Sequence, residues 1–157
     1  MPGDSDLRLK RVSVIQLDQV ERIVQDVREM KIEFELVAYR DLAGVAISLI
    51  ISNSKGDGVL HTQSDFNETA QPLFKGNTVV TFTLPPLLLA ADNYSITVAA
   101  HIPHAHTFFL ERDIASFQVE TSNSEILRYP ENSWEGVLNP QIGEWTYMRL
   151  PIESSRP

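Results

Sequence analysis

The chain has 157 residues, of which 43% are hydrophobic, and a formal net charge of -8 at neutral pH. This acidic balance disfavours contact with a phosphate backbone, so it excludes nucleic acid as the expected partner. The absence of cysteine excludes disulfides, thiolate nucleophiles and cysteine-based metal sites. No apolar run reaches the roughly 18 residues that a membrane-spanning helix needs. Length and composition predict a single globular domain over residues 1–157.

Apolar residues recur with a period of two, which is typical of strands with one face on a core and one face outward. The pattern also predicts one helical turn over Leu87–Ala91, and leaves Asp18–Val27 open between helix and strand. Turn residues separate the runs, and Pro85-Pro86 ends one of them because proline cannot donate to a strand ladder. Many short strands with such turns favour an all-β, antiparallel, jelly-roll-like β-sandwich. The predicted strands are Leu9–Gln16, Met30–Ala38, Val45–Ile51, Val59–Gln63, Val79–Leu84, Tyr94–Ile102, Ala115–Val119 and Trp145–Leu150.

The C-terminal part predicts an association between two copies of the chain. Residues 120–143 lack a clear period and form a long connecting arm, and loops of that length in a compact domain need a reason. The strand predicted at residues 145–150 carries large apolar groups on both faces, which suits a strand covered on both sides. We therefore expect a homodimer in which this strand is exchanged, the alternative being an arm that folds back so that the strand pairs within its own chain.

A histidine-rich segment, His101–His106, is the sharpest local motif. With Glu111, the pair His104 and His106 gives the His-x-His-x4-Glu spacing with which many cupin metal sites begin, so the alternative function is a metal-dependent, cupin-like jelly-roll enzyme. Val98 and Gln118 stand where that pattern has glycine, and its second motif is missing. We therefore predict no metal, no cofactor and no catalysis, with the histidines in an exposed turn.

Several segments in order resemble the Wzt C-terminal domain family, over roughly residues 8–150. This resemblance implies a jelly-roll-like carbohydrate-binding module, fused to the ATPase subunit of a bacterial O-antigen polysaccharide ABC transporter. It also implies a strand-exchanged homodimer. The segments are Leu36–Ser52 with Gly56–Val59, Gly76 with Val79–Pro85, Leu89–Val98, Leu110–Asp113, Phe117–Val119, and Gly136, Val137 and Trp145.

The same resemblance implies where the protein works and with which partners. The ligand would be the terminal part of an exported O-antigen polysaccharide, recognised in the cytoplasm at the inner membrane. The ATPase domain would precede Met1, and would connect the module to the membrane subunit of the transporter.

A glycan needs an open surface, and the outward faces of three predicted strands offer one. Larger residues at its rim supply directional hydrogen bonds and a stacking face. The alternatives are a face that is only solvated, and a sandwich with a structural or protein-binding role. The small residues of the expected face are Ala46, Ser48, Thr81, Thr83, Ser95, Thr97 and Ala99. The expected ligand-binding residues are Tyr39, His61, Thr97, His101 and Arg112.

Overall fold

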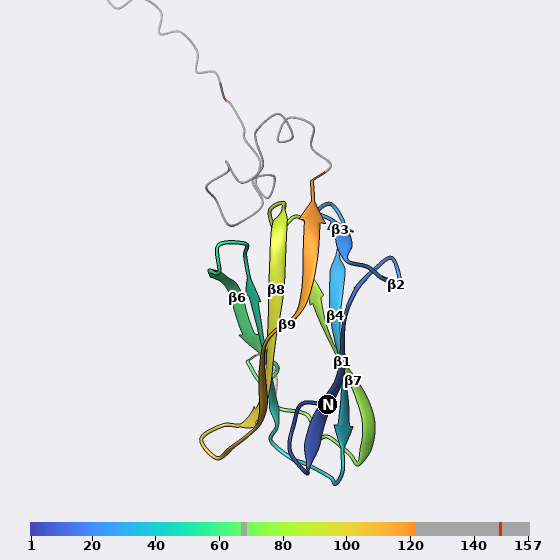
Figure 1. Cartoon of the computed structure of the whole chain (residues 1–157), viewed down its shortest axis with the longest axis vertical. Coiled ribbons are helices and arrows are strands. Elements are labelled where there is room, and N and C mark those ends of the chain that lie inside the picture. Colours follow the sequence, from blue (N-terminus) through green and yellow to red (C-terminus); the bar gives the residue numbers. More distant parts are fainter. Residues whose placement is uncertain (67–68, 122–147, 149–157) are drawn as a thin grey trace, which may run out of the picture.

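The computed structural model describes residues 1–66, 69–121 and 148, and its strands run along the long axis of the molecule (Figure 1). The described residues contain no helix, and therefore none that could cross a membrane. In chain order the strands are β1 (Leu7–Gln16), β2 (Gln19–Val20), β3 (Ile23–Gln25), β4 (Met30–Ala38), β5 (Ala46–Ser52), β6 (Gly58–Gln63), β7 (Gly76–Leu84), β8 (Asp92–Ile102) and β9 (His106–Glu120).

These strands form two sheets. Sheet A has the order β2-β1-β4-β7, and sheet B has the order β3-β9-β8-β5-β6. All paired strands are antiparallel except β3, which runs parallel to β9. The chain crosses between the sheets repeatedly, first between β2 and β3 and last between β7 and β8. The predicted all-β sandwich is confirmed.

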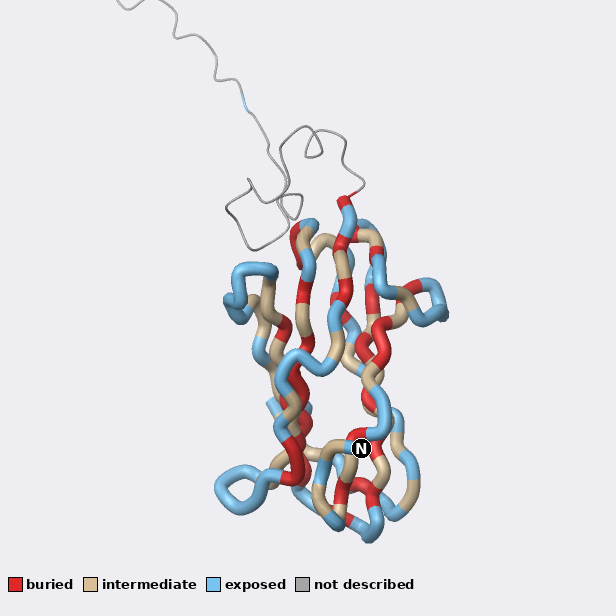
Figure 2. The backbone as a smooth tube through the Cα atoms, in the orientation of Figure 1, coloured by how far each residue is buried: buried red, intermediate tan, exposed pale blue. Residues whose placement is uncertain are grey.

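The core lies between the sheets and follows the period-two pattern. In β4, Met30, Ile32, Phe34, Leu36 and Ala38 are buried while the residues between them are half-buried. Figure 2 shows buried positions recurring along the strands. Burying a large apolar side chain contributes about 1.5–3 kcal/mol, so this alternation fixes which face of each strand turns inward.

Two local predictions need correction. Leu87–Ala91 is not helical: Pro86 and Leu87 form a turn, in which the φ of Leu87 is 62° and lies outside the right-handed helical region. The strand predicted over Ala115–Val119 is the end of the much longer β9. The open segment 18–27 contains β2 and β3. The connecting arm, from residue 122 onward, and the predicted strand at 145–150 lie outside the described residues, apart from Met148.

Candidate functional site

The outward face of sheet B places side chains from β6, β5 and β8 in one row. His61 lies opposite Ile50, and Ile50 lies opposite Thr97. His101 follows Thr97 by four residues, so it lies on the same face about 13 Å further along β8. The core-facing partners in β8 are Ile96 and Val98, both fully buried.

Small side chains form the floor of this face. Ala46, Ser48 and Thr97 point away from the core, yet all three are buried. Ser48 lies between Gln63 of β6 and Ala99 of β8 in the strand register.

A bulge in β9 borders the floor. Ile96 pairs with Ala115 and Val98 with Glu111, so Arg112, Asp113 and Ile114 together stand opposite Thr97. Asp113 has a φ of 50°, and its backbone N–H donates a 3.1 Å hydrogen bond to Thr97 Oγ1. Bulges re-aim side chains and are common beside functional sites. This one sets the exposed Arg112 beside the floor.

Four of the five residues expected to bind ligand therefore lie on sheet B, and the fifth does not. Tyr39 follows the end of β4 in sheet A, where its N–H donates to the carbonyl of Asp6 and the Arg8 guanidinium lies 5.9 Å from its ring centroid. The structure does not bring Tyr39 together with His61, Thr97, His101 and Arg112. The last four, with Ala46, Ser48 and Ala99, are called the sheet B face below.

Thr81 and Thr83 do not belong to the sheet B face either, and their predicted placement is wrong. They lie on β7, which pairs with β4 in sheet A. The period-two pattern shows which side of its own strand a residue occupies, but not which strand lies alongside. Their hydroxyls therefore face outward on the opposite sheet.

The sheet B face combines an uncharged floor with polar groups at its border. His61 and His101 offer ring nitrogens, and Arg112 offers guanidinium donors. Hydroxyl groups come from Ser48 and Thr97. Such a set can give directional hydrogen bonds to a polar ligand lying across the strands.

The three residues of the cupin-like hypothesis are not assembled into a metal site. His104 is in the turn after β8, while His106 and Glu111 are on β9, five residues and about 16 Å apart along the strand. No group of three or more histidine, aspartate or glutamate residues in the described part of the chain is placed to hold a metal ion.

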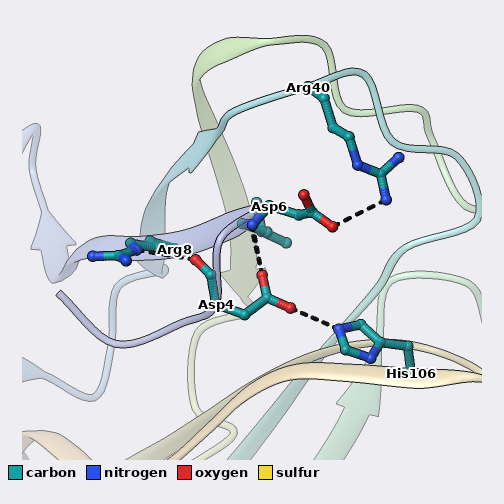
Figure 3. A network of polar contacts seen from close by, with 6 residues as sticks. Asp4, Asp6, Arg8, Arg40 and His106 are labelled. Carbon is teal, nitrogen blue, oxygen red and sulfur yellow. Dashed lines mark hydrogen bonds and ion pairs between the residues drawn. The ribbon is translucent and has the colours of Figure 1, made fainter.

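His106 instead contacts the N-terminal segment (Figure 3). Its Nε2 lies 2.6 Å from Asp4 Oδ2, and its ring packs edge-on against Phe108 with 4.7 Å between centroids. Asp4 Oδ1 accepts hydrogen bonds from the N–H groups of Asp6 and Leu7. One carboxylate thus joins the start of β1 in sheet A to β9 in sheet B.

The pKa of Asp4 lies below its ordinary value. Partial burial alone would raise that pKa, but the hydrogen bonds from His106 and from the backbone of Asp6 and Leu7 outweigh burial. A lowered folded-state pKa means that the contribution of Asp4 to stability is present at neutral pH and is lost as the pH falls through that folded value.

We expect the N-terminal contact to open only in strong acid. In an NMR titration, the amide signals of Asp6 and Leu7 should shift with a midpoint below the value of about 4 that is usual for aspartate. The same transition should be missing in Asp4→Asn. A wild-type midpoint at or above the usual value would contradict the hydrogen bonds that Asp4 accepts in the structure.

Sequence reasoning missed the β9 bulge and the contact between Asp4 and His106. The only signal for the bulge was Arg112-Asp113 between two apolar runs, with an aspartate that tolerates positive φ. Nothing in the sequence pairs Asp4 with a histidine 102 residues away.

Comparisons with known proteins identify a matching family and similar solved structures. Residues 2–132 match the family model described as the Wzt C-terminal domain. A solved structure described as the C-terminal domain of Wzt is 15% identical, with a TM-score of 0.69, covering 92% of this chain and 86% of that one. A Niemann-Pick type C2 protein from Japanese carpenter ant is 8% identical, with a TM-score of 0.48, covering 75% and 96%. No curated protein sequence matches.

Proposed function

Because the chain belongs to the Wzt C-terminal domain family, we propose that it is a non-catalytic module that recognises the terminal part of a bacterial O-antigen polysaccharide and selects it for export by an ABC transporter. The family is associated with transport and not with a known catalytic activity. Within the proposed transporter, the module acts in the cytoplasm at the inner membrane, where a fused ATPase domain connects it to the membrane subunit.

The observation that supports glycan binding is the sheet B face. Its floor is made of small uncharged side chains, and His61, His101 and Arg112 border it. A polysaccharide is long and rich in hydroxyl groups, so it suits a wide surface with directional donors better than a deep apolar cavity.

Removing two bordering side chains tests this proposal. We expect His101→Ala/Arg112→Ala to weaken binding of the O-polysaccharide purified from the same bacterium by about tenfold or more, or at least 1.4 kcal/mol. The measurement is calorimetric titration, with circular dichroism to confirm folding.

The matched control is Lys31→Ala/Thr83→Ala, which also removes one cation and one polar side chain, but from a register pair on the outward face of sheet A. Its affinity should equal that of the unmodified protein. If both double variants bound the polysaccharide with the same affinity, His101 and Arg112 would not belong to the binding site.

We also propose that the chain forms a homodimer through exchange of the strand predicted at residues 145–150. The support comes from the sequence, where both faces of that strand carry large side chains, and from the family resemblance. A strand contributed by the partner would cover a sheet edge that would otherwise invite aggregation.

Truncation after Gly143 should convert the dimer into a monomer, because it removes the exchanged strand and leaves the sandwich of residues 1–121 in place. Multi-angle light scattering measures the mass directly. A monomeric unmodified protein, or a truncated protein that stays dimeric, would refute strand exchange.

A further inference from the structure

A cavity lies between the sheets, at the side where β6 ends sheet B and β7 ends sheet A. Its volume is about 350 Å³, toward the lower end of the roughly 300–1,000 Å³ usual for small-molecule sites. No described strand pairs with the outer edges of β6 and β7. The cavity is lined by Phe34, Ile47, Leu49, Thr62, Gln63, Ser64, Val80, Thr81 and Phe82.

The interior of this inter-sheet cavity is apolar. Phe34, Ile47 and Leu49 belong to the buried core, and Val80 and Phe82 of β7 are half-buried and pack against it. Phe82 therefore keeps part of its ring accessible. An accessible aromatic ring over an apolar floor is a surface on which the C–H face of a ring-shaped ligand can pack.

The rim is polar and uncharged. The side chain of Thr62 points inward and has no hydrogen-bond partner among the residues that the structure describes. Gln63 and Thr81 border the cavity, but their side chains point outward because they pair with the outward-facing Ser48 and Glu33. Ser64 is fixed in place, because its N–H donates to the carbonyl of Ile47 and its Oγ accepts from the N–H of Ile47, both at 2.9 Å. The hydroxyl hydrogen of Ser64 is left to donate to a ligand.

We propose that the inter-sheet cavity binds one neutral sugar ring of the exported glycan, with its C–H face on Phe82 and its hydroxyls on the rim. This inference rests on the proposed function and adds a second subsite to it. Thr62 faces the cavity, whereas the preceding residue, His61, faces outward on the sheet B face. The strand β6 therefore separates the two sites. A glycan bound on the sheet B face would reach the cavity by passing around the outer edge of β6.

An acyl chain is the competing occupant, and the lining disfavours it. Thr62 and Ser64 line the cavity with hydroxyl groups, and an apolar chain would remove the unpaired Thr62 hydroxyl from water without giving it a partner. A carboxylated sugar is disfavoured too, because no lining residue carries a positive charge to pair with it.

The test is a methyl NMR titration of the whole chain with neutral monosaccharides (mannose, galactose, rhamnose and N-acetylglucosamine), with glucuronate and decanoate as comparison ligands. We expect at least one neutral sugar to shift the methyl signals of Thr62, Ile47 and Val80. Thr62→Phe, which fills the cavity, should abolish these shifts. Thr62→Val keeps the side-chain shape without the hydroxyl, so it should weaken binding severalfold even if Thr62→Phe fails to fold. Thr83→Val is the matched control, because it makes the same change on the outward face of sheet A, and it should leave the cavity shifts unchanged.

The possible outcomes separate the cavity from the sheet B face. Sugar-dependent shifts confined to the methyl groups of Ala46, Thr97 and Ala99 would overturn the cavity subsite and leave the proposed function standing. Cavity shifts with decanoate but with no sugar would overturn it in favour of an acyl chain. A panel that shifts no methyl signal in the cavity would also overturn it, whatever the intact polysaccharide does on the sheet B face.

Discussion

Replacing Ile96 by alanine is expected to lower the free energy of unfolding by about 2–5 kcal/mol. Ile96 is fully buried in β8, between Ile51 of β5 and Ala115 of β9, so the deleted atoms leave a cavity in the middle of sheet B. Typical domains are stable by only about 5–15 kcal/mol, so the loss is large. Urea unfolding followed by circular dichroism measures it.

Ile23→Ala is the matched control, since Ile23 is 47% exposed and loses the same atoms. Its cost should stay within about 0.5 kcal/mol. If the two variants were equally destabilised, Ile96 would not be part of the core between the sheets.

Replacing Tyr94 by phenylalanine is expected to cost about 1–3 kcal/mol. The Tyr94 hydroxyl donates a buried 2.5 Å hydrogen bond to the carbonyl of Ala90, four residues upstream, as a tyrosine corner does in other sandwiches. Its ring stacks on Phe117, with 5.4 Å between centroids, and phenylalanine would keep that contact. The variant therefore isolates the hydrogen bond and leaves the Ala90 carbonyl unpaired.

The pKa of Tyr94 supports the same interpretation, because burial raises it far above the ordinary tyrosine value, with a smaller contribution from Asp92. The hydroxyl thus keeps its proton at any pH used for the measurement, and the cost of the variant should not change between pH 6 and pH 9, a range below the usual tyrosine pKa of about 10. Tyr39→Phe, at an exposed ring, should have little effect. An equal cost for both variants would show that the hydrogen bond to Ala90 is not what stabilises the turn before β8.

The sequence predicted the strands well because burial follows from local pattern. The alternation over Met30–Ala38 matches the buried positions of β4 residue by residue, and the same holds for Val80, Phe82 and Leu84 on the inward side of β7. A strand with one face on a core needs apolar residues at every second position whatever its neighbours are. The sandwich class follows from such strands and from the turns between them.

The sequence pattern does not show which strands lie next to each other, and the candidate site depends on that arrangement. Thr81 was expected on the same outward face as Ser48, yet β7 joins sheet A. Tyr39 was misplaced for the same reason. The bulge at Asp113 and the inter-sheet cavity arise from register and sheet packing, which join residues far apart in the chain.

The measurement that tests glycan recognition most directly compares three purified polysaccharides by calorimetric titration into the whole chain. They are the O-polysaccharide of the same bacterium, that polysaccharide with its terminal unit removed by an exoglycosidase, and an unrelated O-polysaccharide. The proposed function predicts saturable binding of the first and loss of binding for the other two. Equal binding of all three, or binding of none, would contradict it.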